Sequence, residues 1–425
     1  MDKQLKRNIF SLLILQKANY ILPFLIIPYL TRVLGPANFG KISFIQAVVT
    51  YFLLFTEYGF NMSASRQIAI HRNDQQKLNT IFWTTTYTKA LLAGISLLIL
   101  LSACASVKEM RSDTWLYLVT YSLVLQSLFS PIWFLQGMDK PALIIPITVL
   151  PKFASLLLIF FFVRRQDDYA EAMIIQFLVA FVLTAVICVV LFRRLKLVQY
   201  YHPNWREIRA SLADGWHLFL STAAISFYTT SNTVLLGIMT NNQVVGYFAA
   251  ADKLVKGVQA LIFTIGQASY PRMNKLVSES KEKAISFLVN CLKWMGGAGL
   301  ICSAGLLIFA ETAVHIVFGA NNYKPAIEVV RILAVSPFFV AISYVFGILG
   351  LLPFGYTRSY SRIYIITGLI SLVINVPLTY FYNMYGVAVS VLITEMAIAA
   401  IMLRLLQKNG ILVPQHLRLL LKNKN

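Results

Sequence analysis

Three charged residues interrupt one apolar stretch, GYFAAADKLVKGVQALIFTIGQASYPRM at residues 246–273. In a helix of 3.6 residues per turn, Asp252, Lys253 and Lys256 crowd into one sector. A charge at the centre of a bilayer costs at least about 2.5–3.5 kcal/mol, so each of them needs a partner, water or a ligand. Two explanations are open: an internal salt bridge from Asp252 to Lys256 at i,i+4 spacing, or a water-filled cavity that attracts anions. Two lysines facing one carboxylate favour the cavity.

The other charged residues inside apolar stretches also indicate an excess of positive charge. Cations outnumber acids there, and an intramembrane positive excess indicates a cavity that receives anions. We therefore predict a cationic substrate-binding lumen and a smaller set of acidic partners. The predicted substrate-binding residues are Lys17, Lys89, Lys152, Lys253, Lys256 and Lys293, and the predicted charge-partner or coupling residues are Glu57, Asp252 and Glu395.

The two acids predicted to lie on lumen-lining segments have different surroundings. Asp252 lies beside two lysines, which favour its ionised form, so its expected role is structural. Glu57 has no charged residue within six positions along the chain. Glu57 is therefore the better candidate for a proton carrier.

No pattern of residues indicates catalysis or metal binding. The five histidines are scattered, and the four cysteines lie in apolar stretches without metal-ligand spacing. We therefore expect no catalytic residues, no metal, no cofactor and no enzymatic activity.

Composition defines the broad class of protein. The chain has 425 residues, of which 58% are hydrophobic and 13% charged, and its mean hydropathy is +0.69. Apolar runs of about 20 residues recur from end to end, which is typical of a polytopic α-helical membrane protein. The net charge of +20 lies mostly between these runs, in the pattern that orients membrane proteins, so we expect no nucleic-acid partner.

The apolar runs predict twelve membrane spans. They cover residues 9–34, 42–65, 81–104, 114–136, 141–163, 169–192, 215–239, 244–270, 284–308, 325–350, 360–382 and 384–406. With this map, 23 of the 37 Lys and Arg residues lie on the face that carries both termini, and seven lie on the opposite face. Because cytoplasmic loops are enriched in Lys and Arg, both termini are predicted to be cytoplasmic.

One longer loop, at residues 193–214, divides the chain into two halves. It predicts an N-terminal six-helix bundle at 1–195, a linker at 196–214 and a C-terminal six-helix bundle with a basic tail at 215–425. Within the linker, Trp205, Ile208 and Leu212 have helical spacing, which suits an interfacial helix, although a solvated linker fits nearly as well. An offset of 206 residues aligns Gly40 with Gly246, so we predict two bundles related as parallel repeats around a central cavity.

One motif is misleading. Residues 35–41, GPANFGK, match the GxxxxGK pattern of a phosphate-binding loop, but Ile42 stands where Ser or Thr would follow. The motif also follows a membrane span rather than a strand, and Pro36 has no N–H to donate. We interpret it as a tight turn between the first two spans.

Four longer motifs resemble a known family. They are NYILPFLIIPYLTRVLGPANFG (19–40), EYGFNMSASRQIA (57–69), SPIWFLQG (130–137) and SLADGWHLFLSTAAISFY (211–228). Together with residues 246–273, they resemble Wzx-type O-antigen flippases of the multidrug/oligosaccharidyl-lipid/polysaccharide exporter superfamily. The likeness covers nearly the whole chain, although each motif is loosely defined.

The resemblance implies a function and a location. It implies two six-helix bundles around a lumen lined largely by spans 1, 2, 7 and 8. It implies transport of oligosaccharide repeat units on undecaprenyl diphosphate from the cytoplasmic to the periplasmic leaflet of a Gram-negative inner membrane. The implied partners are this lipid-linked oligosaccharide, inner-membrane lipids, an O-antigen polymerase and a chain-length regulator.

Two other classes of protein remain open at this stage. An ion-coupled drug exporter of the same superfamily would share the fold, but it should favour buried carboxylates over buried lysines. A membrane glycosyltransferase or polymerase should show catalytic carboxylates or histidines that converge, usually with a large external loop. The predicted outer loops are all short.

The charge distribution gives a direct test of topology. Cysteines introduced at Lys3, Trp205 and Lys424 should react with a membrane-impermeant reagent only from the cytoplasmic side. The measurement is accessibility labelling in intact cells and in inverted vesicles. Labelling of any of the three positions from the periplasm would overturn the span map.

Overall fold

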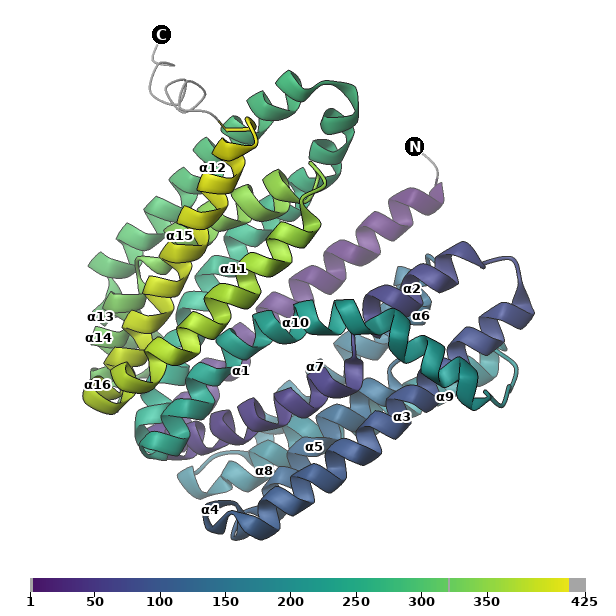
Figure 1. Cartoon of the computed structure of the whole chain (residues 1–425). Coiled ribbons are helices and arrows are strands. Elements are labelled where there is room, and N and C mark those ends of the chain that lie inside the picture. The colour runs from purple at the N-terminus through teal and green to yellow at the C-terminus, as the bar shows by residue number, and fades with distance from the viewer. Residues whose placement is uncertain (1–2, 320–321, 413–425) are drawn as a thin grey trace. The chain divides into compact units, whose positions relative to one another are not determined.

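The computed structural model describes residues 3–319 and 322–412, apart from the side chains of residues 3–21, 109, 221, 224, 225 and 227. Every regular element in these ranges is a helix (Figure 1). The chain forms two compact units, Met1–Ser226 and Phe227–Asn425, and the division falls inside helix α10 (Trp205–Met239). The described part of the chain therefore does not include the side chain of Lys17 or the tail from residue 413 onward.

The helices of the two units follow in chain order. Unit 1 contains α1 (Lys3–Glu57), α2 (Phe60–Ile70), α3 (Gln75–Ser106), α4 (Lys108–Arg111), α5 (Thr114–Phe129), α6 (Ile132–Gly137), η1 (Pro141–Leu143), α7 (Ile144–Phe162), η2 (Gln166–Asp168), α8 (Tyr169–Met173), η3 (Ile174–Val179), α9 (Ala180–Leu195) and the first part of α10. Unit 2 contains the rest of α10, α11 (Asn242–Glu279), α12 (Lys281–Ile308), α13 (Ala310–Phe318), α14 (Lys324–Leu333), α15 (Ser336–Tyr344), η4 (Val345–Leu351) and α16 (Thr357–Lys408).

Eight stretches of the described chain are long and apolar enough to cross a membrane. Helices α1 and α16, which belong to two of these stretches, each contain one residue with non-helical backbone: Gly35 (φ 72°, ψ 173°) in α1 and Asn383 (φ 50°, ψ −133°) in α16. Each break lies between two predicted spans. Helices α10 and α11, which match predicted spans 215–239 and 244–270, are not among the eight stretches found in the described residues. The chain is thus an all-helical membrane protein, while twelve spans in two repeated bundles stay a prediction.

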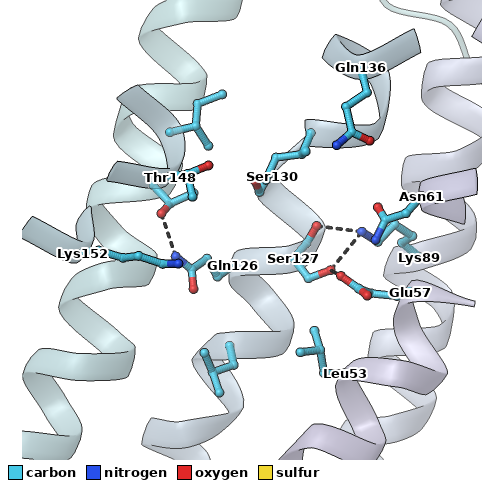
Figure 2. A pocket seen from close by; sticks show the side chains of 14 residues that line it. Leu53, Glu57, Asn61, Lys89, Gln126, Ser127, Ser130, Gln136, Thr148 and Lys152 are labelled. Carbon is cyan, nitrogen blue, oxygen red and sulfur yellow. Dashed lines mark hydrogen bonds between the residues drawn. The ribbon is translucent and has the colours of Figure 1, made fainter. Parts of the chain in front are cut away.

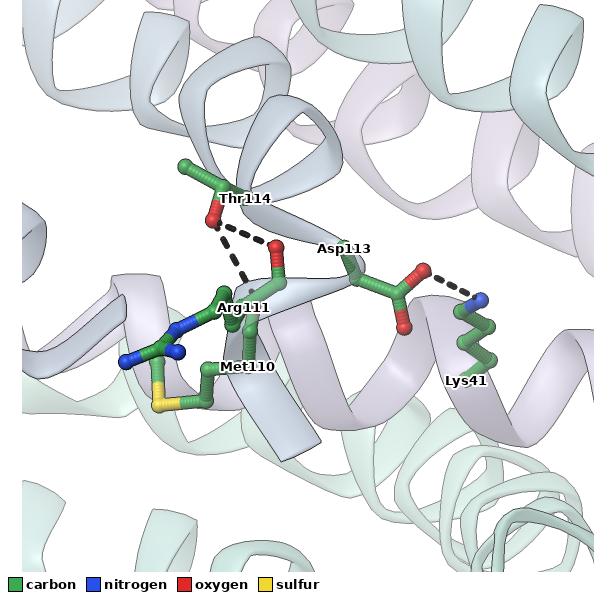
Figure 3. A network of polar contacts seen from close by, with 5 residues as sticks. All are labelled: Lys41, Met110, Arg111, Asp113 and Thr114. Carbon is green, nitrogen blue, oxygen red and sulfur yellow. Dashed lines mark hydrogen bonds and ion pairs between the residues drawn. The ribbon is translucent and has the colours of Figure 1, made fainter. Parts of the chain in front are cut away.

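The predicted turn at residues 35–41 is wrong in extent. Only Gly35 leaves the helical conformation, and the helix resumes at Pro36, where the missing N–H costs no hydrogen bond. Lys41 is therefore helical, and its ammonium lies 2.7 Å from the carboxylate of Asp113 and 5.1 Å from the centre of the Tyr169 ring. Figure 3 shows Lys41 extended toward Asp113, which precedes α5. The lysine of the misleading motif thus ties α1 to the α4–α5 connection.

Two predicted spans contain breaks that the apolar pattern does not indicate. Predicted span 42–65 is interrupted at Tyr58 and Gly59, which both have left-handed backbone with φ of 45° and 77°. Predicted span 114–136 is interrupted at Ser130 and Pro131. Proline lacks an N–H and pushes the residue before it toward extended backbone, which explains the second break. The helix is therefore interrupted inside both predicted spans.

Close packing holds the segments around these breaks. A Cβ atom added to Gly137 at the end of α6 would lie 2.7 Å from Ile68 Cβ and 2.7 Å from the Ser65 carbonyl oxygen of α2. Arg72 Nε also donates to the Gly137 carbonyl at 2.6 Å. Helix α6 and helix α2 therefore pack with almost no space between their backbones.

The start of α10 covers the α1–α2 break. A Cβ atom on Gly215 would lie 2.9 Å from the Tyr58 carbonyl oxygen, and the rings of Tyr58 and Phe219 stack with centroids 4.7 Å apart. Within the predicted linker 196–214, for which the sequence leaves an interfacial helix and a solvated linker both open, residues 205–214 form the first turns of α10. Trp205 is 65% exposed, while Leu212 packs against the core of unit 1.

The Gly137 contact predicts a stability effect. Gly137→Ala should destabilise the protein by about 1–3 kcal/mol, because the new methyl group overlaps α2 backbone and forces the helices apart. Gly94→Ala is the matched control, since nothing lies within 4 Å of its added Cβ in α3. It should stabilise by about 0.5–1 kcal/mol. Thermal unfolding of the purified proteins measures both, and an equal response of the two variants would contradict the close α2–α6 contact.

Candidate functional site

The break between α1 and α2 places Glu57 at a helix end. Glu57 is the last residue of α1, and α2 starts three residues later at Phe60. The last carbonyl groups of a helix have no partners within the helix. Irregular backbone at membrane depth is tolerated only where it is buried in protein or lines a water-filled cavity.

The break between α5 and α6 opens on the same space. The Ser130 N–H still donates to the Gln126 carbonyl at 2.9 Å, and α6 begins two residues later. Ser127 before the break, Ser130 at the break and Gln136 after it line the same cavity as Glu57. Two interrupted helices thus border one polar space inside unit 1.

This space, which we call the charged cavity, has a volume of about 330 Å³ (Figure 2). Its walls come from helices α1, α2, α3, α5, α6, α7 and α9. The lining residues are Leu53, Glu57, Asn61, Lys89, Leu123, Gln126, Ser127, Ser130, Ile132, Gln136, Ile147, Thr148, Lys152 and Thr184.

Lys89 is held firmly in the wall of the charged cavity. It is only 2% exposed, and its ammonium donates to the Ser127 carbonyl at 2.7 Å and to the Ser127 hydroxyl at 3.0 Å. The Ser127 hydroxyl donates in turn to Glu57 Oε1 at 3.2 Å. Ser127 therefore links a buried cation to a carboxylate, and this linkage offsets the cost of burying the lysine.

The environment of Lys152 differs from that of Lys89. It comes from α7 and reaches the charged cavity from the side opposite Lys89 (Figure 2). Its side chain is exposed, in contrast to that of Lys89. The structure thus brings together Glu57, Lys89 and Lys152, three of the predicted site residues.

A second charged group lies in unit 2, on α11. The ammonium of Lys256 lies 2.7 Å from Asp252 Oδ2, and the side chains are 51% and 20% exposed. The internal salt bridge that the spacing allows is therefore formed. Lys253 interacts electrostatically with both residues. Asp252, Lys253 and Lys256 form one connected charge group.

Glu395 on α16 belongs to the surroundings of this group. The Tyr228 hydroxyl lies 3.4 Å from Glu395 Oε1, and Lys256 is close enough to Glu395 to interact with it electrostatically. The Tyr228 ring also stacks on Tyr364, with centroids 6.2 Å apart. Lys293 is a half-buried residue of α12, and for Lys17 the structure describes the backbone alone.

The pattern of charged residues in the sequence does not predict the uncharged polar residues that line the charged cavity. The amides of Asn61, Gln126 and Gln136 and several hydroxyl groups make up much of its polar lining. The signal that could have found some of them is the set of family motifs. The motif at 57–69 contributes Glu57 and Asn61, and the motif at 130–137 contributes Ser130, Ile132 and Gln136.

The described residues show no metal site. In residues 3–319 and 322–412, no group of three His, Cys, Asp or Glu side chains could hold a metal ion. The arrangement in the charged cavity offers instead cationic, amide and hydroxyl groups for binding a polar anionic ligand.

Comparison with solved structures defines the fold. The chain superimposes on a multidrug resistance MATE family transporter of the MOP superfamily with a TM-score of 0.72 and 14% identity, covering 96% of each chain. It superimposes on the lipid II flippase MurJ with a TM-score of 0.73 and 12% identity, covering 97% of this chain and 91% of that one. The protein has the fold of these membrane transporters.

Comparison at the level of sequence identifies the family. The family model described as "Polysaccharide biosynthesis protein" matches residues 5–277. The "Putative O-antigen transporter" of Escherichia coli K12 is 34% identical over 96% of this chain and 98% of its own length. Its namesake from Shigella dysenteriae is 32% identical over 94% of this chain and 99% of its own length. The chain belongs to this polysaccharide biosynthesis family, and the resemblance to O-antigen flippases drawn from its motifs is confirmed.

The network in the charged cavity predicts coupling between Glu57 and Lys89. Glu57→Gln removes the carboxylate that compensates the buried ammonium, and Lys89→Met leaves that carboxylate without its cation, so each change should destabilise the protein. The double variant should lose less stability than the sum of the losses in the two single variants, with a difference of at least about 0.5 kcal/mol. The measurement is a double-mutant cycle on the thermal stability of the purified proteins.

The control cycle uses another lysine of the same helix. Lys77 is at the exposed start of α3, where it pairs with Asp74 at 3.9 Å. Lys77→Met combined with Glu57→Gln should be additive. Additivity of the Lys89→Met and Glu57→Gln pair as well would show that Ser127 does not connect the two charges.

Proposed function

We propose that this protein is a flippase that moves undecaprenyl-diphosphate-linked O-antigen repeat units from the cytoplasmic to the periplasmic leaflet by alternating access. The single observation that carries the proposal is the charged cavity, in which two lysines on separate helices accompany amides and hydroxyls. The O-antigen transporter relatives support the choice of substrate. The lipid II flippase shares the fold and supports nothing beyond it.

The diphosphate of the substrate is assigned to Lys152. Diphosphate carries two negative charges that cannot cross hydrocarbon unaided, and an exposed lysine that lines the cavity can receive them. Lysine is a mobile point charge, which suits a headgroup that must also leave. Lys89 is committed to Ser127, so its contribution is the positive field rather than a direct contact.

We assign to Glu57 the coupling of proton binding to substrate binding and release. When all are ionised, Glu57, Lys89 and Lys152 carry one net positive charge, and protonation of Glu57 raises this to two, which matches the diphosphate. A proton on Glu57 would therefore favour the loaded cavity, and its loss would favour release. Transport by Glu57→Gln that still responds to an imposed pH gradient would contradict this role.

The group on α11 is assigned to the same substrate. Lys253 and Lys256 would offer unit 2 its own cationic surface, with Asp252 as their structural partner and Glu395 as a second acid near Lys256. Lys17 and Lys293 remain proposed members of the cationic lumen.

Two alternatives are less well supported. An ion-coupled drug exporter has the same fold, but the charged cavity holds two cations and one acid, and not the reverse. A glycosyltransferase or polymerase is disfavoured because the curated relatives are named as transporters.

We place the protein in a Gram-negative inner membrane with both termini cytoplasmic, as the distribution of Lys and Arg predicts. Inner-membrane lipids surround it, and an O-antigen polymerase and a chain-length regulator would take over the transported units.

The role of Lys152 can be tested by display of O-antigen on a flippase-deleted strain that carries each variant. Lys152→Gln should reduce display by about tenfold or more, because one charge-assisted contact to the diphosphate is lost. Lys152→Arg keeps the charge and should retain part of the activity. Protein amounts are compared by immunoblot. Full display by Lys152→Gln would contradict the assignment.

Lys256 is the comparison, because its salt bridge offers a structural explanation for any loss. If Lys256 binds diphosphate, Lys256→Gln should be defective, and adding Asp252→Asn should not rescue it. If Lys256 serves only as a partner of Asp252, the double variant should recover, since the orphan charge is gone. Recovery would remove Lys256 from the substrate-binding set.

A further inference from the structure

Two more pockets of unit 1 lie along α2, next to the charged cavity. The first, of about 530 Å³, shares Asn61 and Gln136 with the charged cavity, and we call it the bridging pocket. The second, of about 330 Å³, shares Ser63, Gln67 and Asp214 with the bridging pocket. The three spaces therefore lie next to one another as a series along α2.

The third space differs in chemistry from the charged cavity. It is lined by hydroxyl groups, one amide and two carboxylates, so we call it the hydroxyl pocket. Its polar lining residues are Ser63, Gln67, Thr80, Thr84, Thr85, Glu207, Ser211 and Asp214, and no Lys or Arg is among the described residues that line it. Two carboxylates without a cation repel a diphosphate, while oxygen acceptors and hydroxyl donors suit the hydroxyl groups of a sugar.

The carboxylates of the hydroxyl pocket are fixed by local hydrogen bonds. Asp214 accepts from the Gln67 amide at 3.2 Å. Glu207 accepts from the Asn204 N–H at 2.9 Å and from the Tyr201 hydroxyl at 2.7 Å. The bond to Glu207 raises the pKa of the Tyr201 hydroxyl, so Tyr201 stays a donor at neutral pH. The wall is thus preorganised around α2, α3 and the start of α10.

One hydroxyl in this wall has no partner. Thr84 is 6% exposed, and its hydroxyl makes no hydrogen bond with the described residues. A buried hydroxyl without a partner is unfavourable, so its presence needs an explanation. The Thr84 hydroxyl oxygen is closed off in its present rotamer, but a threonine in a helix has two accessible χ1 rotamers. Because Thr84 lines the hydroxyl pocket, a change of rotamer would let a ligand there supply the partner.

We propose that the hydroxyl pocket is a subsite for the uncharged sugars of the lipid-linked substrate. The inference rests on the proposed function and extends it. Along this series, Lys89 and Lys152 accompany Glu57 at one end, and Arg66 lines the bridging pocket in the middle. The other end has only oxygen acceptors, hydroxyl groups and one amide among its described polar residues. A headgroup with an anionic diphosphate at one end and neutral sugars at the other has the matching order. Asn61 and Gln136, shared by two of the spaces, would contact the sugars nearest the diphosphate.

The test separates recognition of sugar from recognition of diphosphate. The full-length protein is placed in lipid nanodiscs, and its affinity is measured for two probes. One is bare undecaprenyl diphosphate, and the other is undecaprenyl-diphosphate-linked repeat units isolated from a flippase-deleted strain. Thr84→Val, which removes one hydroxyl at constant shape, should weaken binding of the sugar-bearing lipid about three- to tenfold and leave binding of the bare lipid unchanged. Ser211→Ala is the second variant and should act in the same direction.

The control removes a similar hydroxyl elsewhere. Ser43 is 5% exposed in α1, its hydroxyl also lacks a partner among the described residues, and it lines none of the three spaces. Ser43→Ala should leave both affinities unchanged. If Thr84→Val and Ser211→Ala change neither affinity, or change both equally, the sugar subsite is excluded. Failure of the unmodified protein to bind either probe would contradict the proposed function itself, and the subsite with it.

Discussion

Backbone N–H and C=O groups cannot be left without partners in hydrocarbon, and this constraint shapes unit 1. Helices α1 and α5 both stop within a stretch long and apolar enough to span a membrane, at Glu57 and at Phe129. The amides at the breaks remain bonded, as those of Tyr58 to Leu54 and Ser130 to Gln126 show. Carbonyl groups freed at such breaks need water or polar side chains. A polar cavity beside both breaks is the consequence.

The same constraint explains the dense packing around the cavity. A break removes helical hydrogen bonds, and contacts elsewhere must hold the two segments in place. Glycines at 137 and 215 allow α6 and α10 to lie directly against α2 and against the break at Tyr58. Gly59 supplies a left-handed conformation that other residues adopt only with strain. Family motifs that look unrelated along the chain are therefore parts of one packing arrangement.

The membrane class, the helix content and the family could be predicted from the sequence, because length, hydropathy and motif order carry them directly. The break at Asn383 also lies where the apolar runs divide. The breaks inside predicted spans 42–65 and 114–136 could not be predicted, because hydropathy does not register backbone conformation. The link from Lys89 through Ser127 to Glu57 was invisible for another reason. Its members come from three helices, and only tertiary packing brings them together.

The close spacing of charged residues in the sequence predicts a substrate-binding group on α11. The structure shows why charges on separate helices are better suited to coupling charge to movement. Asp252 and Lys256 are about one turn apart on the same helix, so their backbone separation is set by that helix and not by how helices are arranged. Glu57, Lys89 and Lys152 are on α1, α3 and α7, so their mutual distances depend on how these helices are arranged. A transporter must bind its substrate differently in its two states, and a ligand shifts an equilibrium only through such a difference. Charges on separate helices can supply that difference, whereas a pair on one helix cannot by itself. The charged cavity of unit 1 is therefore the better place for coupling charge to movement.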